Sequence, residues 1–137
     1  MSTDSRAYGD GDCSYHAAGQ LPGITQLVDA FYTYMETLPE AKRILAMHPS
    51  DLVLSRRKLT YFLSGWLGGE RLYSQNFGAI SIPQVHRHLG VNSVDRDAWL
   101  LCMQKAVADQ PYEESFKSYL MEQLFVPAER IRQVCAK

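Results

Sequence analysis

The sequence predicts an all-α fold in one domain. Leu, Ala and Met, which favour helix, sum to 32 residues, whereas Val, Ile and Thr, of which Val and Ile especially favour strand, sum to 18. Gly and Pro stand where helical patterns end, and not at the spacing of β-hairpins. We find no internal repeat, low-complexity run or linker. A chain of 137 residues that is 46% hydrophobic is long enough to bury one full core.

Charge and composition argue against several classes of function. The chain has 14 Lys and Arg against 15 Asp and Glu, which argues against a nucleic-acid partner because polyanion binders carry a basic face. No window approaches the roughly 20 apolar residues that cross a bilayer. Residues 1–16 lack the apolar run of a secretory signal, and three cysteines without ligand spacing fit reduced thiols. We therefore expect a cytoplasmic protein without a membrane partner.

The first half of the chain predicts three helices after a loose start. Residues 1–20 are rich in Gly, Asp and Ser, so we expect a flexible extension before a domain over residues 21–137. From Pro22, apolar residues recur at helical spacing, namely Leu27, Val28, Phe31, Tyr32, Met35 and Leu38. Pro39 suits the first turn of a short helix that Pro49 ends. Ser50 or Asp51 is expected to cap a third helix, which runs to Leu67 before Gly68-Gly69.

The second half predicts an irregular stretch and then further helices. Residues 70–80 show no clear period and are expected to be irregular. A short helix opens at Ser81 and Pro83 and closes at Gly90, and a long one runs from an Asn92 or Ser93 cap through Ala108 with Val94 inward. Pro111 opens the last helix. Val126-Pro127 is expected to kink or break that helix before a final turn over residues 128–135.

The short helix near Gly90 is predicted to place one histidine on an apolar face. At about 100° per residue, one side carries Ile82, Val85, His86 and Leu89. The polar side carries His88, Ser81 and Gln84. A buried imidazole needs a hydrogen-bond partner or a metal. This helix alone favours an ordinary core histidine bonded to a backbone carbonyl, and leaves a metal ligand as the alternative.

Other polar aromatic residues stand on apolar faces or at helix ends. Tyr32 lies between Val28 and Met35, and Trp99 lies one turn before Met103. Each carries a hydrogen-bond donor that needs an acceptor when the side chain is buried. His48 precedes Pro49 at a helix end, where a histidine interacts well with the helix dipole. Taken singly, each of these residues fits ordinary packing.

Together these residues form a recognisable pattern that covers about Leu27 to Val107. Its strings are LVDAFY (27–32), MHPSDL (47–52), KLTYFLSGWLGG (58–69) and RDAWLLCM (96–103). In this order they resemble the group II truncated haemoglobins. The resemblance implies a truncated globin fold, a two-over-two helical sandwich around haem b (iron protoporphyrin IX).

The resemblance also implies the site residues. In this family the proximal histidine follows a glycine and precedes the tryptophan of the RDAWL-like string at fixed distances. His86 stands eight residues after Gly78 and thirteen before Trp99, which matches without gaps, whereas His88 needs two compensating indels. His86 is therefore the expected iron ligand. The resemblance implies distal positions at Tyr32, His48, Ser55, Leu59 and Trp99, and cofactor contacts at Lys58, Tyr73, Phe62, Arg87 and Leu89.

The chain departs from the family near the expected ligand. Glu70 follows Gly68-Gly69 where the family often has proline. The stretch GAISIPQV (78–85) lacks the usual histidine and arginines, and Val85 replaces a basic residue beside the ligand. This change weakens the case for a propionate anchor on that side, where Arg87 is a candidate substitute.

The expected function is the binding of O₂ and other diatomic ligands at a histidine-ligated haem iron. One imidazole leaves an axial position open, unless Tyr32 or His48 fills it. Donors at Tyr32 and Trp99 would retain O₂. Slow release suits reaction of the held O₂ with a second molecule such as nitric oxide, or a haem that activates peroxide, better than delivery. Alternatives are a peroxidase, a nitric-oxide dioxygenase or nitrite reductase, or a sensor with a separate partner; CO is a further candidate ligand. Redox turnover would need a separate reductase or electron donor.

Overall fold

The computed structural model describes residues 8–78 and 86–135, and this part of the chain is helical without strands, as the sequence predicts. The α-helices and two short 3-10 helices are α1 (Cys13–Ala17), α2 (Gln20–Thr37), η1 (Pro39–Ala41), α3 (Lys42–Ala46), α4 (Val53–Trp66), α5 (Leu72–Phe77), η2 (Arg87–Leu89), α7 (Ser93–Ala108) and α8 (Glu114–Cys135). Within the described residues, no helix is both long and apolar enough to span a bilayer.

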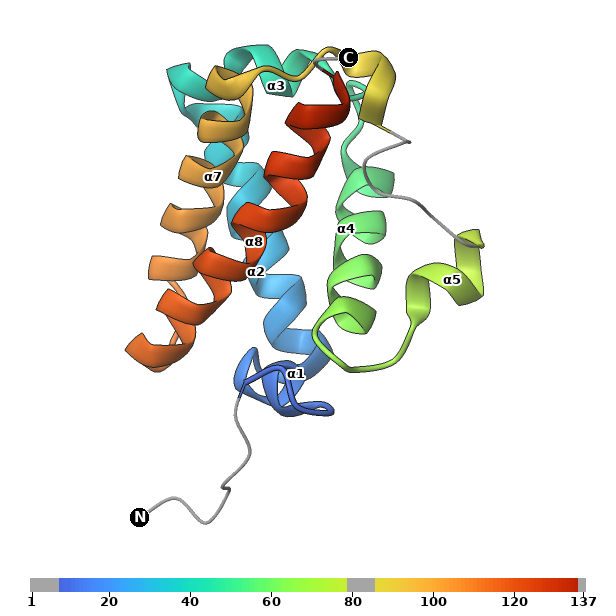
Figure 1. Cartoon of the computed structure of the whole chain (residues 1–137), viewed down its shortest axis with the longest axis vertical. Coiled ribbons are helices and arrows are strands. Elements are labelled where there is room, and N and C mark those ends of the chain that lie inside the picture. Colours follow the sequence, from blue (N-terminus) through green and yellow to red (C-terminus); the bar gives the residue numbers. More distant parts are fainter. Residues whose placement is uncertain (1–7, 79–85, 136–137) are drawn as a thin grey trace.

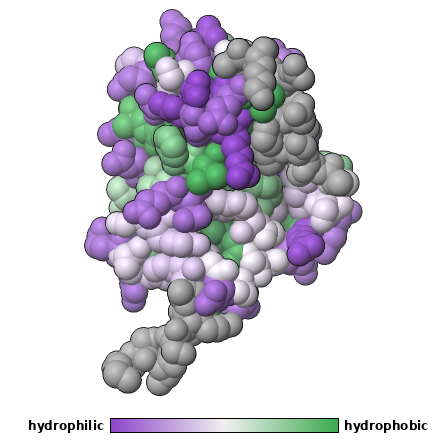
Figure 2. Space-filling model, viewed as in Figure 1, coloured by the Kyte–Doolittle hydropathy of each residue, from purple (hydrophilic) through white to green (hydrophobic). Residues whose placement is uncertain are grey.

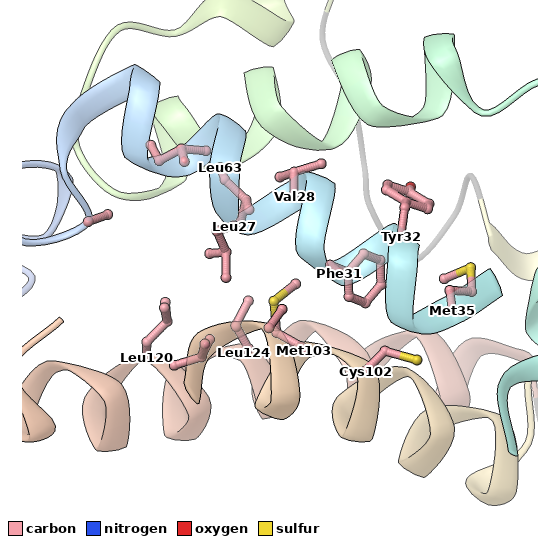
Figure 3. Close-up of a cluster of buried hydrophobic side chains, with 14 of the residues drawn as sticks. Leu27, Val28, Phe31, Tyr32, Met35, Leu63, Cys102, Met103, Leu120 and Leu124 are labelled. Atoms are coloured by element: carbon pink, nitrogen blue, oxygen red, sulfur yellow. The ribbon is translucent and has the colours of Figure 1, made fainter. Parts of the chain in front are cut away.

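Four long helices build the core in two pairs (Figure 1). Helix α2 packs against both α4 and α7, and α7 packs against α8. The fully buried stripe of α2 includes Leu27, Val28, Phe31 and Met35. Figure 3 shows how this stripe divides, with Phe31 directed toward α7 and α8 while Val28 and Tyr32 lie on the side of α4. Helix α2 therefore pairs with α4 and also contacts the second pair, α7 and α8, through α7.

The described part of the expected flexible extension, residues 8–20, is folded against the helices. Residues 13–17 form α1, and Ala18 is fully buried. Glycines hold this segment against the end of α4. Gly68 has a φ of +97°, and a Cβ there would lie 2.1 Å from the carbonyl oxygen of Gly11. This contact is made between backbone atoms, so it leaves no periodic apolar pattern in the sequence. Composition therefore predicts a loose segment.

Two expectations in the second half are wrong, and a third is narrowed. Residues 72–77, expected to be irregular, form α5, whose side chains are all at least partly exposed. Val94, expected inward, is 70% exposed. A kink or a break is expected at Val126-Pro127, and helix α8 continues through Pro127 without a break. The proline removes one N–H donor, but this stretch of the helix is exposed, so water can satisfy the carbonyl that loses its partner. Packing of α7 along α8 further stabilises the continuous helix.

The predicted helix ends are mostly confirmed. Asn92 caps α7, because its side chain accepts from the Asp95 amide at 2.8 Å while the Asp95 carboxylate accepts from the Asn92 amide at 3.1 Å. Helix α7 ends at Ala108 as predicted. Asp51 accepts from the Val53 amide at the start of α4. Gly90 closes η2 with a φ of +66°, and the preceding stretch 79–85 lies outside the described residues.

Candidate functional site

Four aromatic rings meet between α2, α7 and the turn after α3. Phe31 contacts Tyr32 and Trp99 with ring centroids 5.0 and 5.2 Å apart. Tyr32 meets His48 edge-on at 5.8 Å. Phe31 and Tyr32 are buried, while Trp99 and His48 are half-buried. The fold thus brings together three of the predicted distal residues from segments far apart in the sequence.

The Tyr32 hydroxyl is a neutral donor. Burial raises the pKa of Tyr32 to about 12, although the Arg56 guanidinium, 5.6 Å above the ring, lowers it in part. The hydroxyl donates to the Ser55 carbonyl oxygen at 3.5 Å, the outer limit of a hydrogen bond. Little energy is therefore lost when this hydroxyl turns to another acceptor.

The His48 ring is fixed in one tautomer when neutral. Its Nδ1–H donates to the Ile44 carbonyl oxygen at 2.8 Å. A carbonyl only accepts, so Nε2 of the neutral ring carries the lone pair. The contact spans one helical turn, so the end of α3 orients the ring. His48 thus offers an acceptor nitrogen next to a phenolic donor.

Helix α4 presents a half-buried apolar face. Ser55, Leu59, Phe62 and Trp66 recur at three- and four-residue steps, and all are half-buried. Phe62 stacks on Trp66 with centroids 6.3 Å apart. A shallow groove of about 280 Å³ follows between α4 and α5, lined by Tyr61, Phe62, Gly65, Trp66, Arg71, Tyr73 and Ser74. Tyr73, expected near a propionate, is half-buried in this groove, whereas Lys58 is exposed and lies over the Phe77 ring.

His86 lies at the start of a short turn beside the end of α8. It is half-buried, and its carbonyl oxygen accepts from the Cys135 thiol at 3.4 Å. His88, the competing candidate, is exposed, and Leu89 is half-buried. The Arg87 side chain and Val85 lie outside the described residues. This order of burial favours His86 over His88, as the helical face and the family spacing do.

Comparison with known proteins identifies the fold family. Residues 13–132 match the bacterial-like globin family. The chain belongs to this globin family. It is 33% identical over 114 residues to the group 2 truncated hemoglobin YjbI of Bacillus subtilis (strain 168), and this match covers 83% of each chain. Sequence and fold together place it among the group II truncated haemoglobins.

Solved globins share the arrangement of helices. The group II 2-on-2 hemoglobin of Agrobacterium tumefaciens superposes with a TM-score of 0.84 at 27% identity, over 96% of this chain and 98% of that one. The truncated oxygen-avid haemoglobin of Bacillus subtilis superposes with a TM-score of 0.78 at 31% identity, over 86% and 97%. The expected two-over-two globin fold is confirmed.

Globin membership identifies haem as the cofactor, and the described residues fit it. Haem needs an apolar wall, an axial imidazole and room for a ligand. The half-buried face of α4 would supply the wall, and the half-buried His86 would supply an imidazole from a separate segment. Tyr32 adds a buried neutral donor. Family membership also supports binding of small diatomic ligands such as O₂.

Three polar residues of this region are missed by sequence reasoning. Arg56 lies over the Tyr32 ring and pairs with Glu36 at 3.2 Å. Arg43 and Cys135 contact the segment that carries His86. Arg56 stands next to Ser55 on a predicted helix and could have been found from helical geometry. Arg43 and Cys135 stand more than forty positions from their partners, and no local pattern marks them.

Proposed function

We propose that this haemoglobin binds O₂ and related diatomic ligands at a haem iron ligated by His86, and that Tyr32 and Trp99 retain the ligand. This proposal rests on the state of the Tyr32 hydroxyl. The group is buried and protonated, and it makes only a weak hydrogen bond to the Ser55 carbonyl oxygen. A donor in this state can turn to a ligand without first losing a strong bond. The proposal also agrees with the oxygen avidity of the Bacillus subtilis relative.

Haem, held by the His86 imidazole, would supply an iron that binds a diatomic ligand. The protein decides how long the ligand stays. Tyr32 and Trp99 both pack on Phe31, so one ring positions both of the side chains that carry these donors. Each donor stabilises a ligand atom with partial negative charge by about 1–3 kcal/mol. Two donors in one cluster thus favour slow release over delivery.

A second candidate function is redox turnover, and His48 favours it. Its neutral tautomer leaves Nε2 free to accept a proton, and the ring edge meets Tyr32. A proton could pass between these groups during reaction with nitric oxide, nitrite or peroxide. Such turnover needs electrons from a separate donor. Its test is turnover with a defined reductant, in which His48→Phe keeps the packing, removes the acceptor nitrogen and slows the reaction.

Composition supports a cytoplasmic setting. All three cysteines are free thiols, and two of them, Cys13 and Cys102, are buried. Reduced thiols suit a cytoplasmic location, where an electron donor would also be available.

The experiment for ligand retention compares O₂ dissociation in Tyr32→Phe and Trp99→Phe with the natural protein. Loss of about 1–3 kcal/mol accelerates dissociation by roughly 5- to 150-fold in each variant. Tyr34→Phe is the matched control, because Tyr34 lies on the same helix and donates to Asp109 at the surface. Unchanged rates in both test variants would reject the proposal.

A further inference from the structure

Arg43 connects two segments that lie far apart in the sequence. It belongs to α3, and its Nε lies 2.9 and 3.0 Å from the two carboxylate oxygens of Asp95 in α7. Its Nη2 donates to the carbonyl oxygen of Gly90 at 3.4 Å. Gly90 ends the turn that begins at His86. One guanidinium therefore joins α3 to the start of α7 and to the end of the His86 turn.

The Asp95 carboxylate is a fixed anchor for this contact. It is only 2% exposed, and it also accepts from the Asn92 amide at 3.1 Å. A buried carboxylate in a capping box cannot move without uncapping α7. The Arg43 side chain is 61% exposed, so its position is set by this partner rather than by burial. The planar guanidinium reaches Asp95 and Gly90 together, which a lysine ammonium does not reproduce.

Helix α3 carries the group that orients His48. The Ile44 carbonyl oxygen, one residue after Arg43, accepts from His48 Nδ1 at 2.8 Å. The His48 ring in turn meets Tyr32. A change in the position of α3 therefore moves the His48 ring, while a change at Gly90 alters the turn of His86. Arg43 belongs to α3 and is hydrogen-bonded to Gly90, so it links these two segments.

We propose that Arg43 is a positioning residue that couples the His48 side of the haem site to the His86 side. This inference rests on the proposed function, in which His86 ligates the iron and His48 lies near the ligand. Through Asp95 and Gly90, Arg43 holds α3 and the His86 turn in one register. Loss of the guanidinium frees the two segments from each other and changes both sides of the site at once.

The test uses Arg43→Met in the haem-loaded protein, since methionine keeps an unbranched stem without charge or donors. Resonance Raman spectra report the iron–histidine stretch in the ferrous form and the iron–CO stretch in the CO form. Both bands shift or broaden in Arg43→Met, and O₂ dissociation rises about two- to fivefold, the effect that one partly exposed charged contact supplies. Arg43→Lys recovers only part of the natural spectrum. Lys42→Met, also exposed on α3, is the matched control and leaves both bands unchanged.

Hydrogen exchange of the haem-loaded protein gives a readout that does not depend on which histidine binds iron. In Arg43→Met, amides of residues 42–48 and of residues 87–90 exchange faster together. A shift of only one Raman band, or faster exchange in only one segment, overturns the coupling. Equal effects in Lys42→Met overturn it as well. If Arg43→Met does not hold haem, the same comparison is made with Arg43→Lys. An iron–histidine band that survives in His86→Ala refutes the proposed function instead and leaves the exchange result standing.

Discussion

The two sides of the proposed haem site are held in place by different means. On the distal side, Tyr32 and Phe31 belong to the buried stripe of an 18-residue helix that packs on both α4 and α7. On the proximal side, the described residues show His86 in a short turn whose carbonyl groups are bonded to Cys135 and Arg43. Core packing fixes the first side, and a few long-range polar contacts fix the second.

This contrast indicates where the site can change independently of the fold. Tyr32 cannot shift without disturbing the core, because it is buried and packs on Phe31, which is fully buried and also contacts Trp99. The proximal turn depends on contacts worth about 1 kcal/mol each. Substitutions should therefore affect stability strongly on the distal side and iron coordination on the proximal side.

The largest expected effect tests whether His86 is the proximal ligand of the haem iron. His86→Ala removes the proposed ligand, so we expect loss of the natural ferrous haem spectrum and of the iron–histidine stretch. His88→Ala is the matched control, because this exposed residue is two positions away. Absorption and resonance Raman spectra of both variants make the measurement. Loss of coordination only in His88→Ala would reverse the assignment and with it the comparison of the two sides.

The next effect tests how far the distal side depends on the core. Phe31→Ala leaves a cavity between Tyr32 and Trp99, so we expect it to lower the free energy of unfolding by about 3–5 kcal/mol. Denaturant titration measures this loss, and the same variant should release O₂ faster because both donors lose their support. Phe125→Ala is the control, since that ring is 44% exposed and should cost less than about 1 kcal/mol. Similar losses in both variants would contradict a packed distal wall.

The same contrast explains which parts of the fold could be predicted from the sequence. The apolar stripe of α2 and the Asn92 cap of α7 are local patterns, and both are confirmed. Helix α5 is too exposed to show a stripe. The ordered segment around α1 depends on close backbone contact at Gly68, which adds no apolar residue to the pattern.

The candidate site follows the same rule. Tyr32 and Trp99 are on predicted helices, so periodicity alone marks them as partly or fully buried polar aromatics. His86 needs the family spacing in addition, and its role as iron ligand stays a prediction. The contact of Arg43 with Gly90 spans 47 positions. It depends on the final placement of α3 beside the His86 turn, which no sequence window contains.

A smaller effect concerns pH on the distal side. Burial raises the pKa of Tyr32 from 10.0 to about 12, so the native state keeps a proton that the unfolded chain releases. Stability from this group is therefore present below about pH 10 and is lost as the pH rises toward about 12. The loss amounts to at most about 3 kcal/mol. Unfolding titrations across this range should fall less steeply for Tyr32→Phe than for the natural protein.

Tyr112→Phe is the control for this pH effect. Burial also raises the pKa of Tyr112 to about 12, so its removal should flatten the alkaline loss in the same direction. Tyr112 packs on Phe116, outside the aromatic cluster of Tyr32. O₂ dissociation should therefore change in Tyr32→Phe and not in Tyr112→Phe. An equal change in both variants would mean that alkaline stability, and not the distal donor, governs ligand release.

The smallest effect lies on the proximal side. The Cys135 thiol donates to the His86 carbonyl oxygen at 3.4 Å, and a thiol is a weak donor. Cys135→Ala should therefore lower the free energy of unfolding by less than about 1 kcal/mol while shifting the iron–histidine stretch. Cys135→Ser keeps a donor at this position and should shift the band less. If Cys135→Ala leaves the band in place, the end of α8 does not position the ligand, and the His86 turn depends on its contact with Arg43.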